Sequence, residues 1–258
     1  MRHLGLALLV VFILLPLAQA ILLSFTATLP TDQVAEGTIG LMNYRSVLAA
    51  PELRAAMVNS ALYVSLNVAL CIAVGLPAAY ALARHRFTGD RHFLLAILVF
   101  RVTPPVVLSL PIFILFSRFG LVNSPVGIAL VHCLFNLPVA IWVLESFIRA
   151  VPRAFDETAF LDGHSGQSFF FRHLIPQIAP GIGVAAFFCF IFSWVEVVFA
   201  RILTVTGGKP ITMAIQAMFS FQTDFGMVMA MTCLSLVPGL AMIWFVRNHL
   251  ARGFTLRA

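Results

Sequence analysis

The sequence predicts an all-α, polytopic membrane protein, and three observations lead to this fold class. The chain has 258 residues, of which 61% are hydrophobic and only 10% charged, whereas soluble domains average about 25% charged residues. Long apolar runs carry no Asp, Glu, Lys or Arg. These runs are also continuous, while the strands of a membrane β-barrel alternate between apolar and polar residues.

Six apolar runs are long enough to span a membrane. A helix needs roughly 20 apolar residues to cross a hydrocarbon layer of about 30 Å. We therefore expect one transmembrane domain over residues 1–258 with six spans. The expected spans cover about residues 4–25, 58–83, 93–117, 126–145, 177–200 and 225–246, with Arg101 interrupting the third.

The first run also has features of a secretory signal peptide. Arg2 precedes an apolar stretch that ends in the small-residue string Ala18-Gln19-Ala20. Apolar residues continue through Phe25, which makes the run long enough to span. We therefore expect a membrane helix here.

The basic residues predict that both termini are cytoplasmic. With the amino terminus inside, ten basic residues fall in inner segments and five in outer ones, and Arg101 stays in the membrane. This bias agrees with the positive-inside rule. The distribution of the basic residues thus accounts for the net charge of +6 by the orientation of the chain in the membrane. We expect no nucleic-acid partner. The inner basic residues are Arg2, Arg84, Arg86, Arg91, Arg149, Arg153, Arg172, Arg247, Arg252 and Arg257.

The sequence lacks the motifs of common catalytic and metal sites. No Cys-x-x-Cys, Gly-x-Ser-x-Gly or His-Glu-x-x-His string occurs. The single lysine, Lys209, is followed by Pro210 and so cannot belong to a P-loop. We expect a non-catalytic chain that binds no metal and no cofactor. The four cysteines lie within the apolar runs as small hydrophobic residues: Cys71, Cys133, Cys189 and Cys233.

The inner segment between the fourth and fifth spans, about residues 146–175, predicts two short helices joined by a glycine. Pro152 suits the first turn of a helix, and Asp156 and Glu157 follow near the positive end of that helix. Gly163 can adopt the left-handed conformation that ends the helix. Ser165 offers the start of another helix, which runs toward Pro176.

This inner segment also holds more phenylalanine than a solvated loop requires. One interpretation is that the rings pack against the ends of the spanning helices or enter the headgroup region. The other is that they contact a partner protein. The rings in question belong to Phe155, Phe160, Phe169, Phe170 and Phe171.

The string Glu157-Thr158-Ala159, two further residues and Asp162-Gly163 form a recognisable pattern. It resembles the EAA loop of permease subunits from binding-protein-dependent ABC importers, in which Glu-Ala-Ala, two variable residues and Asp-Gly precede a proline-containing end. The chain departs from the family pattern at Thr158, His164 and His173.

Four other segments extend the resemblance over nearly the whole chain. They read RVTPPVVLSLP at 101–111, FGLVN at 119–123, FNLPVAIW at 135–142 and ARGFTLRA at 251–258. Together they are similar to the maltose-type branch, whose members transport sugars and polyols.

The resemblance implies a heteromeric complex in the bacterial inner membrane. The expected partners are a second homologous permease subunit, two ATPase subunits or domains that bind ATP and Mg, an extracytoplasmic solute-binding protein, the lipid bilayer and a sugar or polyol. It also implies that the bent segment around Gly163 is a coupling helix that docks on an ATPase subunit. The implied coupling residues are Asp156, Glu157, Thr158, Ala159, Asp162, Gly163 and His164.

Polar residues inside the spans mark a candidate substrate path, because such groups are costly to bury in lipid. Hydrogen-bonding groups beside an aromatic wall would suit a neutral sugar or polyol. The structural alternative is that Arg101 extends toward the interface or pairs with a carboxylate, and that the amides and His132 join helices. Trp194 and Glu196 also fall where sugar permeases carry Trp-Asn-Asp or Trp-Asn-Glu. The candidates are Asn67, Arg101, His132, Asn136, Trp194 and Glu196.

Two other functions stay open from the sequence. A stand-alone secondary transporter would use Arg101 and Glu196 as coupling charges. This function does not explain why the inner segment at 146–175 is bent and partly apolar. A structural or enzyme-anchoring membrane protein would have no ATPase partner. Co-purification with an ATPase, and uptake that follows ATP rather than an ion gradient, would distinguish these functions.

Overall fold

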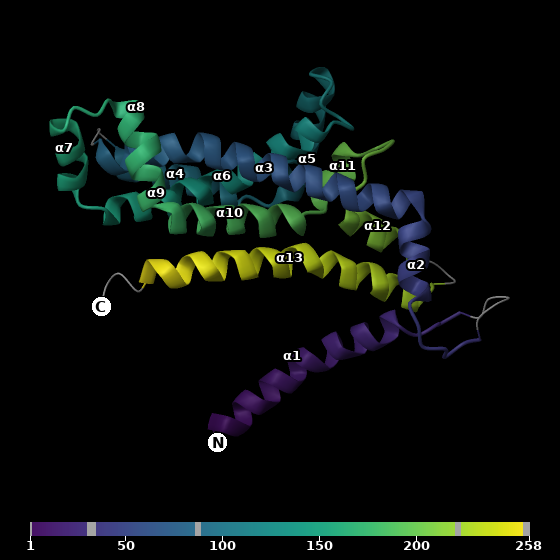
Figure 1. Ribbon diagram of the computed structural model, residues 1–258. Helices are drawn as coiled ribbons and strands as arrows, with labels where there is room; N and C mark the ends of the chain where they lie inside the picture. The colour runs from purple at the N-terminus through teal and green to yellow at the C-terminus, as the bar shows by residue number, and fades with distance from the viewer. Residues whose placement is uncertain (1, 30–34, 86–88, 220–222, 255–258) are drawn as a thin grey trace. The chain divides into compact units, whose positions relative to one another are not determined.

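The computed structural model describes residues 2–29, 35–85, 89–219 and 223–254. Over these residues the chain is built from helices, which confirms the all-α class (Figure 1). The helices form two compact units, one from Met1–Asn59 and Lys209–Leu240 and one from Ser60–Gly208 and Ala241–Ala258. Arg86, Arg257 and the last four residues of the ARGFTLRA segment lie outside the described residues.

The first unit is held together by polar contacts near the ends of its helices. Its elements are α1 (Arg2–Ser24), α2 (Met42–Ala49), α12 (Ile211–Ala217) and the adjoining parts of α3 and α13 (Phe225–Phe254). The buried Asn43 on α2 donates hydrogen bonds to the carbonyls of Ser24 and Thr26, at 3.0 and 2.9 Å.

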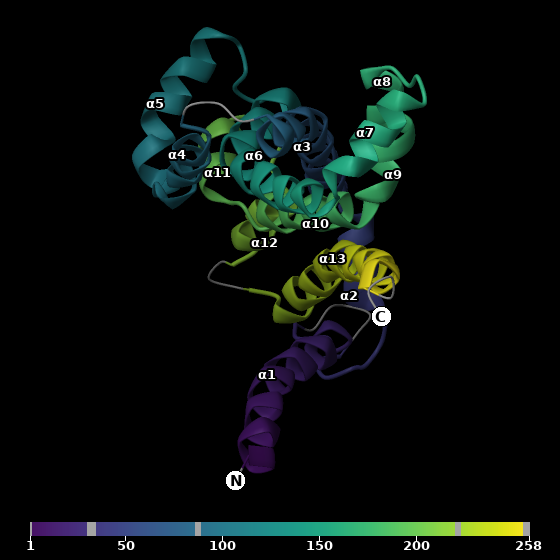
Figure 2. The same cartoon turned by 90° about the vertical axis from the view of Figure 1, so that its left-hand side faces the viewer.

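The second unit contains the main hydrophobic core. Its long helices α3, α6 and α10 run side by side (Figures 1 and 2), and apolar residues such as Cys71, Leu144 and Ala185 are fully buried among them. The elements are α3 (Pro51–Arg84), α4 (Asp90–Val102), α5 (Pro105–Arg118), α6 (Pro125–Ala150), α10 (Ala179–Trp194) and α11 (Val198–Leu203).

A bent helical segment, which we call the elbow, connects α6 to α10. It lies at one end of these two helices (Figure 1). Its final part meets α10 at an angle of 76°, because the helix is broken at Ile178. The elbow consists of α7 (Arg153–Leu161), α8 (Gly166–Phe169), a π-helical stretch (Phe170–Leu174) and α9 (Ile175–Gln177).

The described residues contain three helices that are long and apolar enough to cross a membrane: Pro51–Arg84, Pro125–Ala150 and Phe225–Arg247. They coincide with the second, fourth and sixth expected spans. The third expected span, 93–117, is divided between α4 and α5. α4 ends at Val102, and Pro104, the residue before Pro105, has φ −60° and ψ 127°. Two successive prolines disfavour a helical conformation in the residues that precede them. The count of six spans and the cytoplasmic placement of both termini stay predictions.

Gly127 on α6 lies so close to the backbone of Leu121 that no residue with a Cβ would fit there. A Cβ at this position would overlap the carbonyl oxygen of Leu121 in the preceding loop. We expect Gly127→Ala to lower the free energy of unfolding by about 1–3 kcal/mol, as overpacking does elsewhere. Thermal unfolding in detergent would measure this loss. Gly183→Ala on α10 is the control, because its Cβ would meet no atom within 4 Å; equal melting temperatures for the two variants would contradict the prediction.

Candidate functional site

The elbow forms as its sequence predicts. Pro152 precedes the first residue of α7, and Gly163 ends that helix in a left-handed conformation with φ +81°. The Ser165 hydroxyl then caps α8 by accepting a hydrogen bond from the Ser168 backbone N–H at 3.3 Å. A glycine is favoured at position 163 because a positive φ strains residues that carry a Cβ.

A buried ion pair ties the elbow to α3. Nε and Nη2 of Arg84, the last residue of α3, donate to the two carboxylate oxygens of Asp156 on α7 at 2.7 and 2.9 Å. Nη1 of Arg84 donates to the carbonyl of Val151 at 3.0 Å. The side chains of Arg84 and Asp156 are only 7% and 10% exposed. The contact is therefore a desolvated, two-pronged pair of the kind that fixes both distance and orientation.

The aromatic rings of the elbow divide into a packed set and an exposed set. Phe169 is fully buried, and its ring centroid lies 5.3 Å from that of Phe160 and 6.3 Å from that of Tyr80 on α3. Packing within the protein thus accounts for Phe169. In contrast, Leu161 and Phe171 are 87% and 66% exposed, which leaves an apolar outer surface on the elbow.

The other expected coupling residues lie mostly on the surface of the elbow. Glu157, Thr158 and Asp162 are exposed, whereas Ala159 is buried. The half-buried ring of His164 lies 4.4 Å, centroid to centroid, from the ring of His173. The outer surface of the elbow therefore combines acidic groups with exposed apolar side chains.

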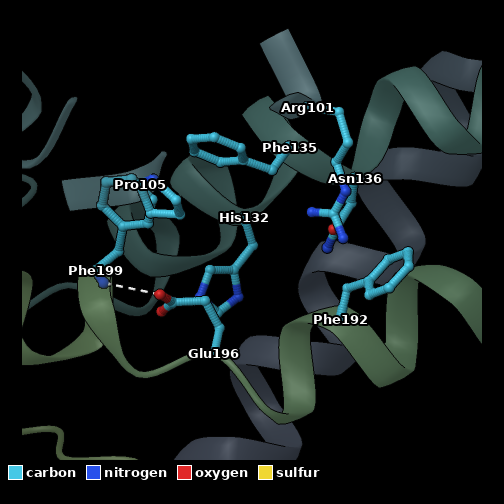
Figure 3. Close-up of a pocket in the computed structure, with 8 residues that line it drawn as sticks. All are labelled: Arg101, Pro105, His132, Phe135, Asn136, Phe192, Glu196 and Phe199. Atoms are coloured by element: carbon cyan, nitrogen blue, oxygen red, sulfur yellow. Dashed lines mark hydrogen bonds and ion pairs between the residues drawn. The ribbon is translucent and has the colours of Figure 1, made fainter. Parts of the chain in front are cut away.

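A small cavity lies between α4, α6 and the α10–α11 connection, and four of the six expected substrate-path residues line it. These are Arg101, His132, Asn136 and Glu196, shown in Figure 3. Its volume is about 70 Å³. A water molecule occupies about 30 Å³ and ligand pockets commonly exceed about 300 Å³, so in this conformation the cavity has room for water-sized molecules but is too small for a sugar ring.

Arg101 and Asn136 lie at one side of the cavity, beside an aromatic ring. The guanidinium carbon of the half-buried Arg101 is 4.0 Å from the centroid of the Phe192 ring on α10. Such a cation–π contact stabilises a charge in a partly desolvated place. The other walls are formed by Pro105, Phe135 and Phe199. The cavity therefore offers hydrogen-bonding groups against an aromatic wall.

Glu196 organises the opposite side of the cavity, where the chain leaves α10. Its carboxylate accepts a hydrogen bond from the backbone N–H of Phe199 at 2.9 Å (Figure 3). It accepts a second one from the backbone N–H of Ala200 at 3.1 Å. Its Oε2 lies 3.3 Å from Nε2 of the buried His132. His132 Nδ1 shares a second hydrogen bond with Ser193 Oγ at 2.5 Å. The side chain thus shapes the break between α10 and α11 and links it to α6.

Asn67 and Trp194 do not line this cavity. Nδ2 of Asn67 on α3 donates to the Ala129 carbonyl at 3.1 Å, and its Oδ1 accepts from Nδ2 of Asn136 at 2.9 Å. These bonds fit the structural interpretation of the amides as links between helices. The Trp194 ring stacks on Phe190 with centroids 5.4 Å apart.

Sequence reasoning missed several members of both sites. Arg84 was counted only as an inner basic residue, and Ser193 is an ordinary residue of an apolar helix. The aromatic rings at Phe135, Phe192 and Phe199 were not distinguished from lipid-facing rings. The sequence supplies one local signal, because Ser193 stands three residues before Glu196.

The comparisons with known proteins agree with this architecture. Residues 72–253 match the family described as binding-protein-dependent transport system inner membrane component. The chain is 30% identical over 235 residues to the probable ABC transporter permease protein y4oR of Sinorhizobium fredii, covering 90% of this chain and 83% of that protein. It is 28% identical over 250 residues to the trehalose transport system permease protein SugB of Mycobacterium tuberculosis, covering 95% and 91%.

A solved structure shares the fold. A chain from a bacterial ABC transporter involved in the import of the acidic polysaccharide alginate superposes with a TM-score of 0.79. The match covers 96% of this chain and 94% of that chain at 19% sequence identity. The family match spans the core helices, the elbow and the cavity described above, and the chain therefore belongs to the inner membrane components of binding-protein-dependent transport systems.

Proposed function

We propose that the chain is a permease subunit of an ATP-driven importer that moves a sugar or polyol into the bacterial cytoplasm by alternating access. It would bind no nucleotide itself. Its partners would be a second permease subunit, two ATPase subunits or domains carrying ATP and Mg, and an extracytoplasmic solute-binding protein. The membrane would be the bacterial inner membrane.

The observation that carries this proposal is the elbow. Its inner side packs on the core helices, and its outer surface exposes Glu157, Asp162 and Leu161, where a partner could bind. It is continuous with α6 and α10, and an ion pair fixes it to α3. A surface that is tied to three core helices is suited to transmit the motion of an ATPase to the transmembrane region.

The cavity supports the choice of a carbohydrate-like solute. Hydrogen-bonding side chains beside aromatic rings are the usual means of binding a polyhydroxylated molecule. The relative from Mycobacterium tuberculosis is described as a trehalose permease. Because the cavity is too small for such a solute here, the helices around it would have to separate during transport.

Co-expression with the products of the neighbouring genes tests the proposal. We expect the chain to co-purify with an ATPase and a second permease. Proteoliposomes of this assembly with its binding protein should take up labelled trehalose, maltose or sorbitol only when ATP is present on the side of the elbow. Uptake driven by a proton or sodium gradient without ATP would instead establish a secondary transporter.

A further inference from the structure

We propose that the Arg84–Asp156 pair is a positioning element that makes α3 follow the elbow during the transport cycle. The inference rests on the proposed function. It concerns the contact between α3 and the elbow, which are not adjacent along the chain. The backbone joins the elbow to α6 through Val151 and to α10 through Ile178. α3 is separated from the elbow along the chain by α4, α5 and α6.

The geometry of the pair suits it to transmit a directional force. Arg84 makes three hydrogen bonds to the elbow side, two to the Asp156 carboxylate and one to the Val151 carbonyl. A guanidinium–carboxylate contact with two parallel bonds restricts rotation as well as distance. Arg153 adds a longer hydrogen bond in which the elbow is the donor and α3 the acceptor, because its Nη2 donates to the Arg84 carbonyl at 3.3 Å.

The apolar contacts of α3 with the elbow do not have this directionality. The Tyr80 ring meets Phe169 and Phe170 with centroid distances of 6.3 and 5.8 Å. Such contacts depend mainly on buried area, so they fix the relative orientation of α3 and the elbow less strictly than two parallel hydrogen bonds do. The ion pair, in contrast, is lost as soon as its partners separate, and separation would leave two buried charges unpaired. A displacement of the elbow should therefore carry the end of α3 with it.

The test compares Asp156→Asn with Asp156→Glu in the complete assembly of both permeases, the ATPase subunits and the binding protein. Asparagine keeps the size of the side chain but removes its charge, whereas glutamate keeps the carboxylate. Arg149→Gln is the matched control, because Arg149 pairs with Glu145 inside α6 and does not join α3 to the elbow. Arg84→Lys is a second test variant, which keeps the charge but loses the two-pronged contact.

The first readout is the amount of labelled sugar taken up per ATP hydrolysed, with trehalose, maltose and sorbitol as probes. We expect Asp156→Asn to hydrolyse ATP within about twofold of the wild type while its uptake falls about tenfold, a typical size for a coupling between two sites. Asp156→Glu and Arg149→Gln should keep the wild-type ratio. A protein that is merely destabilised would lose both activities together.

The second readout does not depend on the solute. Spin labels at Val74→Cys on α3 and Ala154→Cys on α7, both exposed positions, are placed in a chain whose four native cysteines are replaced by alanine. In the wild type the distance between the labels should stay the same when vanadate traps the nucleotide-bound state. Asp156→Asn or Arg84→Lys should broaden or shift this distance on trapping.

An unchanged uptake ratio and an unchanged label distance in Asp156→Asn and Arg84→Lys would overturn the inference and leave the proposed function intact. A wild-type assembly without ATP-driven uptake would instead overturn the proposed function, and the inference with it. Loss of the ratio in Arg149→Gln to the same extent would also overturn the inference, because any ion pair at this end of the bundle would then have the same effect.

Discussion

Gly163→Asp is expected to abolish solute uptake while the chain still inserts into the membrane. The backbone at Gly163 has φ +81°, and nothing lies within 4 Å of an added Cβ, so the substitution causes no clash inside the elbow. Aspartate tolerates the left-handed conformation better than most residues do. The main change is a new carboxylate on the surface that we propose docks on the ATPase, where an unpaired charge would be desolvated at a high cost.

The matched control is Gly163→Asn, which has the same shape and an equal tolerance of positive φ but no charge. We expect this variant to retain a substantial part of the uptake. Uptake in proteoliposomes and co-purification of the ATPase subunit are the measurements, and membrane extraction would verify insertion. Normal uptake by Gly163→Asp would show that the elbow surface is not the docking site.

Glu196→Ala should impair both transport and stability. The change leaves the N–H groups of Phe199 and Ala200 without the carboxylate that accepts their hydrogen bonds, and Nε2 of His132 loses its partner. Each buried polar group that is left unsatisfied costs about 1–3 kcal/mol. The break between α10 and α11 then loses its shape, and with it one wall of the cavity. Because each 1.4 kcal/mol corresponds to about tenfold in an equilibrium, we expect uptake to fall at least about tenfold.

Glu196→Gln separates the roles of charge and hydrogen bonding at this position. The Phe199 and Ala200 N–H groups bond different oxygens of the carboxylate, and the single amide oxygen of glutamine can accept from only one of them. The melting temperature of Glu196→Gln should therefore lie between those of the wild type and Glu196→Ala. Thermal unfolding in detergent and uptake measured on the same preparations provide the comparison. If Glu196→Ala melts and transports as the wild type does, the carboxylate neither supports the helix break nor shapes the cavity.

Features set by local sequence could be predicted well. The spans at α3, α6 and α13 follow from uninterrupted apolar length. The elbow follows from Pro152 and Gly163, whose backbone preferences act within a few residues. The helix break within the third expected span falls at Pro104 and Pro105, because a proline disfavours a helical conformation in the residue before it.

Features that depend on tertiary contacts could not be predicted. The sequence places Asp156 near the positive end of its own helix, and the resemblance adds it to the coupling residues, but neither indicates its partner Arg84, 72 positions away in sequence. Of the polar residues in the spans, the sequence could not separate those that line the cavity from those that join helices. That distinction depends on the rotation of each helix about its axis, which the packing of α3, α6 and α10 determines.

The hydrogen bonds of Asn67 affect how the core helices can tilt. Asn67 joins α3 to α6 within the apolar region, and Asn136 extends the link to the Cys189 carbonyl on α10 at 3.4 Å. Because these hydrogen bonds join α3, α6 and α10 near the same point along their length, the three helices separate more easily at their ends than there. The hydrogen bonds of Asn67 and Asn136 would therefore act as the point about which the three helices tilt. If the helix ends at the elbow moved inward, the opposite ends would move outward.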